Sequence, residues 1–190
     1  MNEYPLPTPN EIRQSRQHLA DWFKKTAPLL RWSQVDSPVG MIYFAVSNHG
    51  LSSLDFGISH EQFVARLDPL ARTEQDDLKP FGQQLQEYFD KRRRQFNLPV
   101  DFSHITPFQR SVLEVTLNIP AGEVWTYGQV AQHIGRPTAS RAVGQALGSN
   151  PVPIVVPCHR VIASSGKLTG YSAGAGIASK QWLLQFEGAL

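Results

Sequence analysis

The sequence predicts an α/β chain in two parts: a small antiparallel sheet with helices, followed by a mainly helical part that contains a helix-turn-helix. Residues 31–56 alternate short β-branched or aromatic runs with turn sequences, which is typical of strands in a meander. Residues 106–148 instead place apolar side chains at helical spacing. Residues 97–100 predict a linker or a short edge strand between the two patterns. We therefore expect domains over residues 1–98 and 99–190.

The N-terminal half begins with a predicted helix over residues 9–26. Its apolar side chains Ile12, Leu19, Trp22 and Phe23 share one face at helical spacing. Three strands are then predicted at 32–35, 40–46 and 51–56, followed by helices at 60–70 and 78–89. The turn sequences between the strands favour antiparallel pairing of neighbours.

The C-terminal half predicts two short helices joined by a tight turn. Helices are predicted over 107–117, 126–135 and 138–147, with Thr106 and Thr138 as N-caps and Gly135 ending the middle helix. The last two make a helix-turn-helix candidate, although many helical hairpins bind nothing. Gly144 and Gly148 would each cost about 1 kcal/mol relative to alanine in a helix interior. A nearby nucleic-acid backbone would compensate for that cost, and so would tight helix packing, which is the commoner explanation.

Length and charge narrow the class of protein. A chain of 190 residues with a net charge of +2 has the make-up of an ordinary globular protein with a sizeable core. Beyond residue 100, six basic residues face four acidic ones, which is compatible with nucleic-acid binding without indicating it. No stretch approaches the roughly 20 apolar residues of a membrane helix, and the N-terminus lacks a signal-peptide pattern. We therefore expect no membrane association, and a cytoplasmic location if the cell is prokaryotic.

The chain has one cysteine, Cys158, and six histidines. One cysteine excludes an internal disulfide and fits a reducing compartment. It also excludes a zinc site built on several cysteines, and the histidines show no metal-ligand spacing. We therefore expect neither a metal nor another cofactor.

Cys158 lies within an apolar, β-branched segment, residues 154–162. Valine and isoleucine at this density favour a short buried strand, and Pro157 predicts its end, with Cys158 facing a cavity. A lone cysteine among valines is commonly a small buried hydrophobe without chemistry. Because successive strand side chains point to opposite faces, His159 is not a base for the thiol merely by being adjacent. These residues alone support a nucleophile and a core residue equally.

A set of motifs surrounds the cysteine between about residue 106 and residue 188. They are Arg141-Ala142-Val143-Gly144, Asn150-Pro151-Val152-Pro153-Ile154, Pro157-Cys158-His159-Arg160-Val161, Gly170-Tyr171-Ser172 and Trp182-Leu183-Leu184. Together they resemble the O6-alkylguanine-DNA alkyltransferases, also called methylated-DNA–protein-cysteine methyltransferases. The N-terminal half resembles that family in layout only. The resemblance implies a small ribonuclease-H-like N-terminal sheet with helices, and a C-terminal domain with a winged helix-turn-helix.

The resemblance implies that Cys158 is an alkyl acceptor. His159 would act on the thiol through a bridging water, in a network completed by Glu187, with Asn150 holding the turn. The implied function is DNA repair by direct reversal, in which an alkyl group, typically methyl, moves from O6-alkylguanine or O4-alkylthymine to the sulfur. Because a thioether has no electrophilic carbonyl for water to attack, such a protein would act once and stay alkylated.

The implied partner is double-stranded DNA that carries the lesion, bound by a monomer from the minor groove. Reaching a base atom inside a duplex requires flipping the nucleotide. Arg141 resembles the family's arginine that enters the vacated stack, and Tyr127 resembles the residue that crowds the phosphate. The implied DNA-binding residues are Arg141, Tyr127, Thr138, Ser140, Gly144 and Gln145. The implied alkylguanine pocket comprises Leu147, Val161, Tyr171, Ser172, Ala173 and Lys180, where Tyr127 and Lys180 would donate to the leaving purine.

Three other classes of protein share parts of this pattern. Non-reactive lesion-binding relatives lack the acceptor cysteine, which this chain keeps at Cys158. A pure helix-turn-helix regulator has no need of the pocket residues. A cysteine hydrolase needs a base oriented by a third group together with an oxyanion hole, and the sequence shows no such motif. The sequence therefore favours a single-turnover alkyltransferase.

Overall fold

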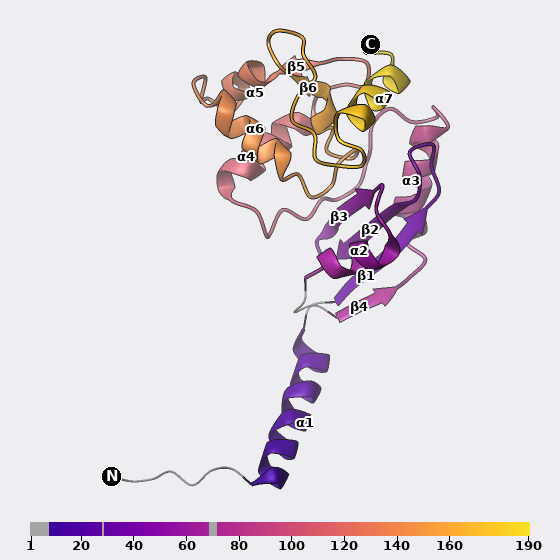
Figure 1. Ribbon diagram of the computed structural model, residues 1–190, viewed down its shortest axis with the longest axis vertical. Coiled ribbons are helices and arrows are strands. Elements are labelled where there is room, and N and C mark those ends of the chain that lie inside the picture. Colours follow the sequence, from indigo (N-terminus) through magenta and orange to yellow (C-terminus); the bar gives the residue numbers. More distant parts are fainter. Residues whose placement is uncertain (1–7, 28, 69–71) are drawn as a thin grey trace.

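The computed structural model describes residues 8–27, 29–68 and 72–190, and it shows a strand-rich part and a helical part (Figure 1). A long helix, α1 (Pro9–Thr26), precedes the sheet and lies away from both parts (Figure 1). This helix has the predicted bounds. The side chains of Ile12, Leu19 and Trp22 on α1 are largely exposed to solvent.

The sheet of the N-terminal part is mixed. It contains β1 (Leu29–Val35), β2 (Ile42–Ser47), β3 (Gly50–Phe56) and β4 (Arg72–Gln75), in the spatial order β3-β2-β1-β4. The predicted meander is confirmed, because β2 pairs antiparallel with both β1 and β3. The sheet as a whole is mixed rather than antiparallel, because a fourth strand that was not predicted, β4, pairs parallel with β1. All four residues of β4 are polar, so no alternating apolar pattern marked them as a strand.

Two helices belong to this part: α2 (His60–Arg66) follows β3, and α3 (Lys79–Phe89) follows β4. Ser59 begins α2 in a capping box with Gln62. This helix ends earlier than predicted, because the backbone of Leu67 is extended, and residues 69–70 of the prediction lie outside the described residues. On α3, Leu85 and Tyr88 are buried, as the predicted apolar face requires.

A segment from outside the sheet pairs with the edge of β3. The N–H of Leu51 donates to the carbonyl of Pro99 (2.8 Å), and the N–H of Asp101 donates to the carbonyl of Leu51 (2.9 Å). The region predicted as a linker or edge strand therefore runs along β3. Gly50 permits this approach, because its φ is +133° and a Cβ there would lie 2.4 Å from the Pro99 oxygen.

The C-terminal part is mainly helical, as predicted. Its elements are α4 (Pro107–Leu117), β5 (Trp125–Thr126), α5 (Tyr127–His133), α6 (Ser140–Gly148), the 3-10 turn η1 (Cys158–Arg160), β6 (Val161–Ile162) and α7 (Ile177–Glu187). Thr106 caps α4 as predicted, because its side chain accepts from the N–H of Gln109. The prediction for Thr138 is wrong: Ala139 occupies the N-cap of α6, and no side chain caps it.

The helix-turn-helix consists of α5 and α6, which pack against each other and against α4. Gly135 ends the turn after α5 with a left-handed backbone (φ +71°), as a helix-terminating glycine should. The apolar faces of the three helices are fully or almost fully buried at Val112, Leu113, Val130 and Val143. Each such side chain stabilises the fold by about 1.5–3 kcal/mol, so this packing fixes the platform on which the cysteine segment rests.

Candidate active site

Cys158 begins the 3-10 turn η1, and the predicted strand through this segment is wrong. Prolines at 151, 153 and 157 lack the N–H groups that a strand ladder needs, which overrides the β-propensity of the valines. The chain instead turns, with the N–H of Val156 donating to the carbonyl of Val152 (2.9 Å) and Ile154 in a left-handed conformation (φ +73°). The thiol therefore sits on a tightly folded loop.

Asn150 holds this loop and contacts the sulfur. Its Oδ1 accepts from the N–H of Val152 (3.1 Å), and its Nδ2 donates to the carbonyl of Val156 (2.9 Å) and to Sγ of Cys158 (3.1 Å). Next to it, the Pro151 carbonyl accepts from the N–H of Leu54 on β3 (2.8 Å). The sheet thereby braces the loop that positions the thiol.

His159 and Arg160 both point to Glu187 at the end of α7. His159 Nε2 lies 3.1 Å from Oε1 of Glu187, and Arg160 donates to Oε2 through Nε (2.9 Å) and to Oε1 through Nη2 (2.7 Å). Arg160 also donates through Nη1 to the carbonyl of Ile119. The predicted link between His159 and Glu187 thus exists as a direct contact within a buried ion-pair network.

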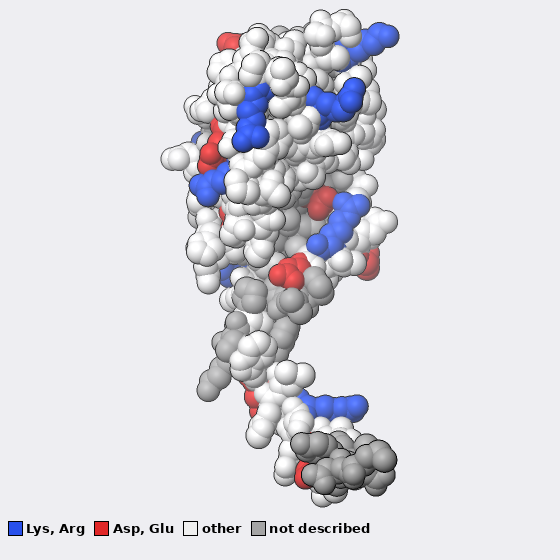
Figure 2. All heavy atoms as spheres, turned by 90° about the vertical axis from the view of Figure 1, so that its left-hand side faces the viewer, with Lys and Arg blue, Asp and Glu red and all other residues white. Residues whose placement is uncertain are grey.

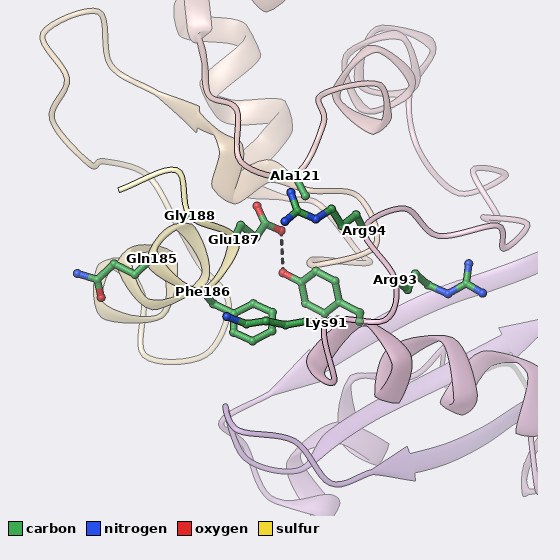
Figure 3. Close-up of a pocket in the computed structure, with 9 residues that line it drawn as sticks. Lys91, Arg93, Arg94, Ala121, Gln185, Phe186, Glu187 and Gly188 are labelled. Carbon is green, nitrogen blue, oxygen red and sulfur yellow. Dashed lines mark hydrogen bonds between the residues drawn. The ribbon is translucent and has the colours of Figure 1, made fainter.

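Tyr88 of α3 completes this network, a role that was not predicted from the sequence. Its hydroxyl donates to Oε1 of Glu187 at 2.7 Å, which Figure 3 marks with a dashed line. On the sequence, Tyr88 is one of several aromatic residues on an apolar helix face, which predicts a core residue. The one available signal was chemical, because a buried tyrosine hydroxyl usually finds a hydrogen-bond partner. We call Glu187, His159, Arg160 and Tyr88 the carboxylate network.

The protonation states of the site follow from burial and hydrogen bonding. Burial alone would raise the pKa of Glu187, but hydrogen bonds from His159 and Arg160 outweigh it and lower the pKa to about 2. Burial lowers the pKa of His159, so its imidazole is neutral at neutral pH. With Glu187 ionised, the ring proton belongs on Nε2, and Nδ1 is left with a free lone pair. That Nδ1 is buried and has no hydrogen-bond partner among the described residues.

The thiol itself is protonated at rest. Burial raises the pKa of Cys158, against the opposing effects of the Asn150 hydrogen bond and the Lys180 charge. The side chain is 6% exposed. Tyr171 is a polar residue near the sulfur. Burial raises the pKa of its phenol, and the nearby Cys158 raises it further. The thiol therefore needs a base to become a nucleophile, and His159 is a neutral imidazole next to it in the chain.

The residues of the implied pocket fall into two groups. Leu147, Val161, Tyr171 and Lys180 are buried, whereas Ser172 is exposed and Ala173 is partly buried. Ser172 donates through Oγ to the Gly148 carbonyl (2.8 Å), so the segment after Tyr171 is attached to the end of α6. Burial thus separates the first four of these residues from the last two.

Lys180 and Tyr127 meet at one backbone carbonyl. Lys180 Nζ donates to the carbonyls of Val161 (2.6 Å) and Thr169 (2.8 Å), and the Tyr127 hydroxyl donates to the same Thr169 oxygen (3.1 Å). Lys180 Nζ lies 5.9 Å from the centroid of the Tyr127 ring. Burial lowers the pKa of Lys180 to about 8, and a thiolate at Cys158 opposes this shift. The two side chains that would donate to a leaving group therefore lie together.

The remaining predicted DNA-binding residues lie on the helix-turn-helix. Thr138, Arg141 and Gln145 are exposed, and Ser140 and Gly144 are partly buried. On the face that carries α5 and α6, basic side chains lie among mostly uncharged ones (Figure 2). A Cβ at Gly144 would lie 3.7 Å from the Tyr127 ring, and a Cβ at Gly148 would meet nothing within 4 Å. Packing within the chain therefore does not demand either glycine.

A cavity of about 220 Å³ opens beside Glu187, lined among others by Lys91, Arg94 and Phe186 (Figure 3). Over the described ranges of the chain, no three or more His, Cys, Asp or Glu side chains are placed to hold a metal ion. Nor is any helix in those ranges both long and apolar enough to cross a membrane.

Comparison with known proteins gives matches to both parts of the chain. The DNA-binding domain of 6-O-methylguanine DNA methyltransferase matches residues 107–189, and the ribonuclease-like domain of the same protein matches residues 30–102. Residues 1–29, which include α1, precede both matches.

Individual relatives agree with this assignment. A methylated-DNA–protein-cysteine methyltransferase of Methanosarcina acetivorans is 40% identical over 154 residues, which is 81% of this chain and 96% of that protein. The Shigella flexneri protein of the same name is 56% identical over 85 residues, covering 45% of this chain and 48% of that protein. The crystal structure of Mycobacterium tuberculosis OGT in complex with DNA superposes with a TM-score of 0.71 at 37% identity, over 84% of this chain and 93% of that one. This chain therefore belongs to the 6-O-methylguanine DNA methyltransferase family.

Proposed function

We propose that this protein repairs alkylated DNA by moving an alkyl group from O6-alkylguanine to Sγ of Cys158, once and irreversibly. The observation that carries the proposal is the arrangement around the sulfur. Asn150 donates to Sγ, and Nε2 of His159, the next residue after Cys158, contacts Glu187. Nδ1 of His159 has no hydrogen-bond partner in the described part of the chain. This set activates a thiol that burial otherwise keeps protonated.

In the proposed reaction, His159 accepts the thiol proton at Nδ1 through a bridging water. The thiolate of Cys158 then attacks the saturated alkyl carbon, so that an S–C bond forms while the C–O6 bond breaks and its electron pair stays on the purine. Tyr127 or Lys180 supplies a proton, so that guanine leaves as a neutral base. That donor is replenished by the proton taken from the thiol, and the step needs no cofactor. The thioether that remains resists hydrolysis.

We further propose how the lesion reaches the sulfur. α5 and α6 lie along the minor groove of a duplex bound by one protein molecule, Arg141 enters the stack, and Tyr127 crowds the phosphate as the nucleotide rotates out. Thr138, Ser140 and Gln145 lie along the backbone. The glycines at 144 and 148, which intrachain packing does not require, support a close backbone approach.

The flipped base is proposed to enter the space between Tyr171 and the cysteine loop. The walls are Leu147, Val161, Tyr171, Ser172 and Ala173. Carbonyl oxygens of Cys158 and Val161 accept from the guanine amine, and O4-alkylthymine is a second substrate for the same pocket. In this proposal residues 99–190 carry the chemistry and residues 1–98 brace it, and a prokaryotic cell would hold the protein in the cytoplasm, on its DNA.

The test is the stoichiometry of lesion removal. A duplex with one O6-methylguanine is incubated with increasing amounts of protein, and the remaining lesion is quantified. The proposal expects removal to rise linearly with protein and to stop at one lesion per molecule, with none removed by Cys158→Ser. Binding without any removal would instead indicate a lesion-binding protein, and repeated turnover of ester substrates would indicate a hydrolase.

A further inference from the structure

The hydrogen bond from Tyr88 to Glu187 joins the two parts of the chain at the catalytic network. Tyr88 lies on α3, beside the sheet, whereas Glu187 ends α7 in the helical part. Both side chains are 2% exposed. Among the described residues before Val100, Tyr88 alone contributes a hydrogen bond to the carboxylate network. The hydrogen bond is therefore the direct link from the strand-rich part to the network.

The Tyr88 ring is held in place by aromatic neighbours. Its centroid lies 4.9 Å from that of Phe89, 5.3 Å from that of Phe96 and 5.5 Å from that of Phe186. Phe186 directly precedes Glu187, so the same contact fixes the ring and the backbone that carries the carboxylate. Tyr88 and Glu187 both line the adjoining cavity, and the dashed line in Figure 3 marks the hydrogen bond to Glu187. The hydroxyl has little freedom to turn elsewhere.

One oxygen of Glu187 serves three donors. Oε1 accepts from Tyr88 (2.7 Å), from Arg160 Nη2 (2.7 Å) and from His159 Nε2, which at 3.1 Å is the longest of the three. Donors that share an oxygen compete for its negative charge. Removing the Tyr88 donor would leave more of that charge to stabilise a protonated His159.

We infer that Tyr88 is a positioning residue for alkyl transfer: its hydroxyl shares Oε1 of Glu187 with His159 and thereby limits how strongly His159 holds a proton. The inference rests on the proposed function, because it assigns a role to Tyr88 in the activation of Cys158. The N-terminal part then tunes the base as well as bracing the loop.

The experiment compares wild type with Tyr88→Phe, which keeps the ring contacts and removes only the hydroxyl. Single-turnover transfer rates from a free benzylated guanine base are measured across pH, so that DNA binding does not enter. On the acid side, Tyr88→Phe should be slower by about threefold to tenfold, and at high pH the two rates should agree within about twofold. Tyr43→Phe is the matched control, since Tyr43 is buried in β2 and stacks on Phe63, away from the network, and its profile should follow wild type.

A second measurement separates positioning from mere packing. In a Glu187→Gln background, Tyr88→Phe should change the pH profile no further, whereas a packing effect would persist there. NMR titration of the His159 ring should show a higher pKa in Tyr88→Phe than in wild type.

Coincident pH profiles and equal His159 titrations would overturn the inference while leaving the proposed function intact. A Tyr88→Phe protein that does not fold would also overturn it, since the hydroxyl would then serve the fold. If wild type itself transfers nothing, it is the proposed function that fails.

Discussion

The guanidinium of Arg160 donates two hydrogen bonds to the carboxylate of Glu187, from Nε to Oε2 at 2.9 Å and from Nη2 to Oε1 at 2.7 Å. Both side chains are almost completely buried, and they come from η1 and α7. The pair therefore fastens the turn that carries Cys158 to the last helix. The Glu187 carboxylate therefore serves both the stability of the fold and the chemistry of the site, because it also orients His159.

Glu187→Gln should lower the free energy of unfolding by about 3–5 kcal/mol, because it leaves the Arg160 charge buried without a counter-charge. Urea denaturation measures the change. Glu114→Gln is the control: Glu114 pairs with Arg110 at 2.8 Å on the surface, with 48% of its side chain exposed, and its loss should cost less than about 1 kcal/mol. Equal effects of the two substitutions would mean that the buried pair contributes nothing special.

The free energy of unfolding should also decrease at acid pH, because Glu187 becomes protonated there. Its pKa is about 2 in the folded protein, below the ordinary value of 4.5, so its stabilising effect is complete above pH 4.5 and is lost as pH falls toward 2. His159 acts in the same direction but begins at higher pH, because burial lowers its pKa from the ordinary 6.5 and the unfolded chain binds its proton more readily below pH 6.5. Chemical denaturation at a series of pH values should show unfolding free energy falling from pH 4.5 to 2. This fall should be smaller in Glu187→Gln, and parallel curves for the two proteins would contradict the assignment.

Asn150→Ala should make Cys158 less reactive. The substitution removes the donor to Sγ, whose effect is to lower the thiol pKa, and frees the carbonyl of Val156 and the N–H of Val152. Alkylation by iodoacetamide, followed by mass spectrometry at neutral pH, should slow by about tenfold, the effect of one charge-assisted hydrogen bond. Gln109→Ala, which removes contacts to Ser149 just before the loop, is the control and should react within about twofold of wild type. Unchanged reactivity of Asn150→Ala would show that the contact to sulfur has no electronic consequence.

Arg141→Ala should separate DNA handling from chemistry. Arg141 is exposed on α6, so its truncation should change stability by no more than about 0.5 kcal/mol. Transfer from duplex DNA should slow much more than transfer from a free benzylated guanine base, because only the duplex requires flipping. Single-turnover rates on the two substrates give the ratio. Equal losses on both would mean that Arg141 supports the fold alone.

Local signals predicted the helices well. The bounds of α1 and α4 match their predictions because amphipathic spacing and the Thr106-Pro107 start are encoded in neighbouring residues. The same holds for Gly135 after α5. The prediction that Thr138 is the N-cap of α6 was wrong, because a residue with good capping chemistry does not by itself determine where a helix begins. Ala139 occupies the N-cap position.

Features formed by residues far apart in the chain could not be predicted from local sequence patterns. β4 exists through pairing with β1, a partner some forty residues away in the chain, and its polar residues carry no strand pattern. The cysteine segment has the composition of a strand, but the hydrogen bonds of Asn150 and three prolines make it a folded loop that ends in a 3-10 turn. Tyr88 and Glu187 are 99 positions apart in the sequence. Helical periodicity on α3 therefore predicted that Tyr88 is in the core but could not predict the partner of its hydroxyl. Glu187, by contrast, came from the family resemblance.

The most direct test of the central claim is the intact mass of the protein after reaction with a duplex that carries O6-methylguanine, followed by peptide mapping. We expect one added methyl group per molecule, located on Cys158, and no further gain with excess DNA. A methyl group on another residue, or full loss of the lesion with the protein mass unchanged, would contradict it.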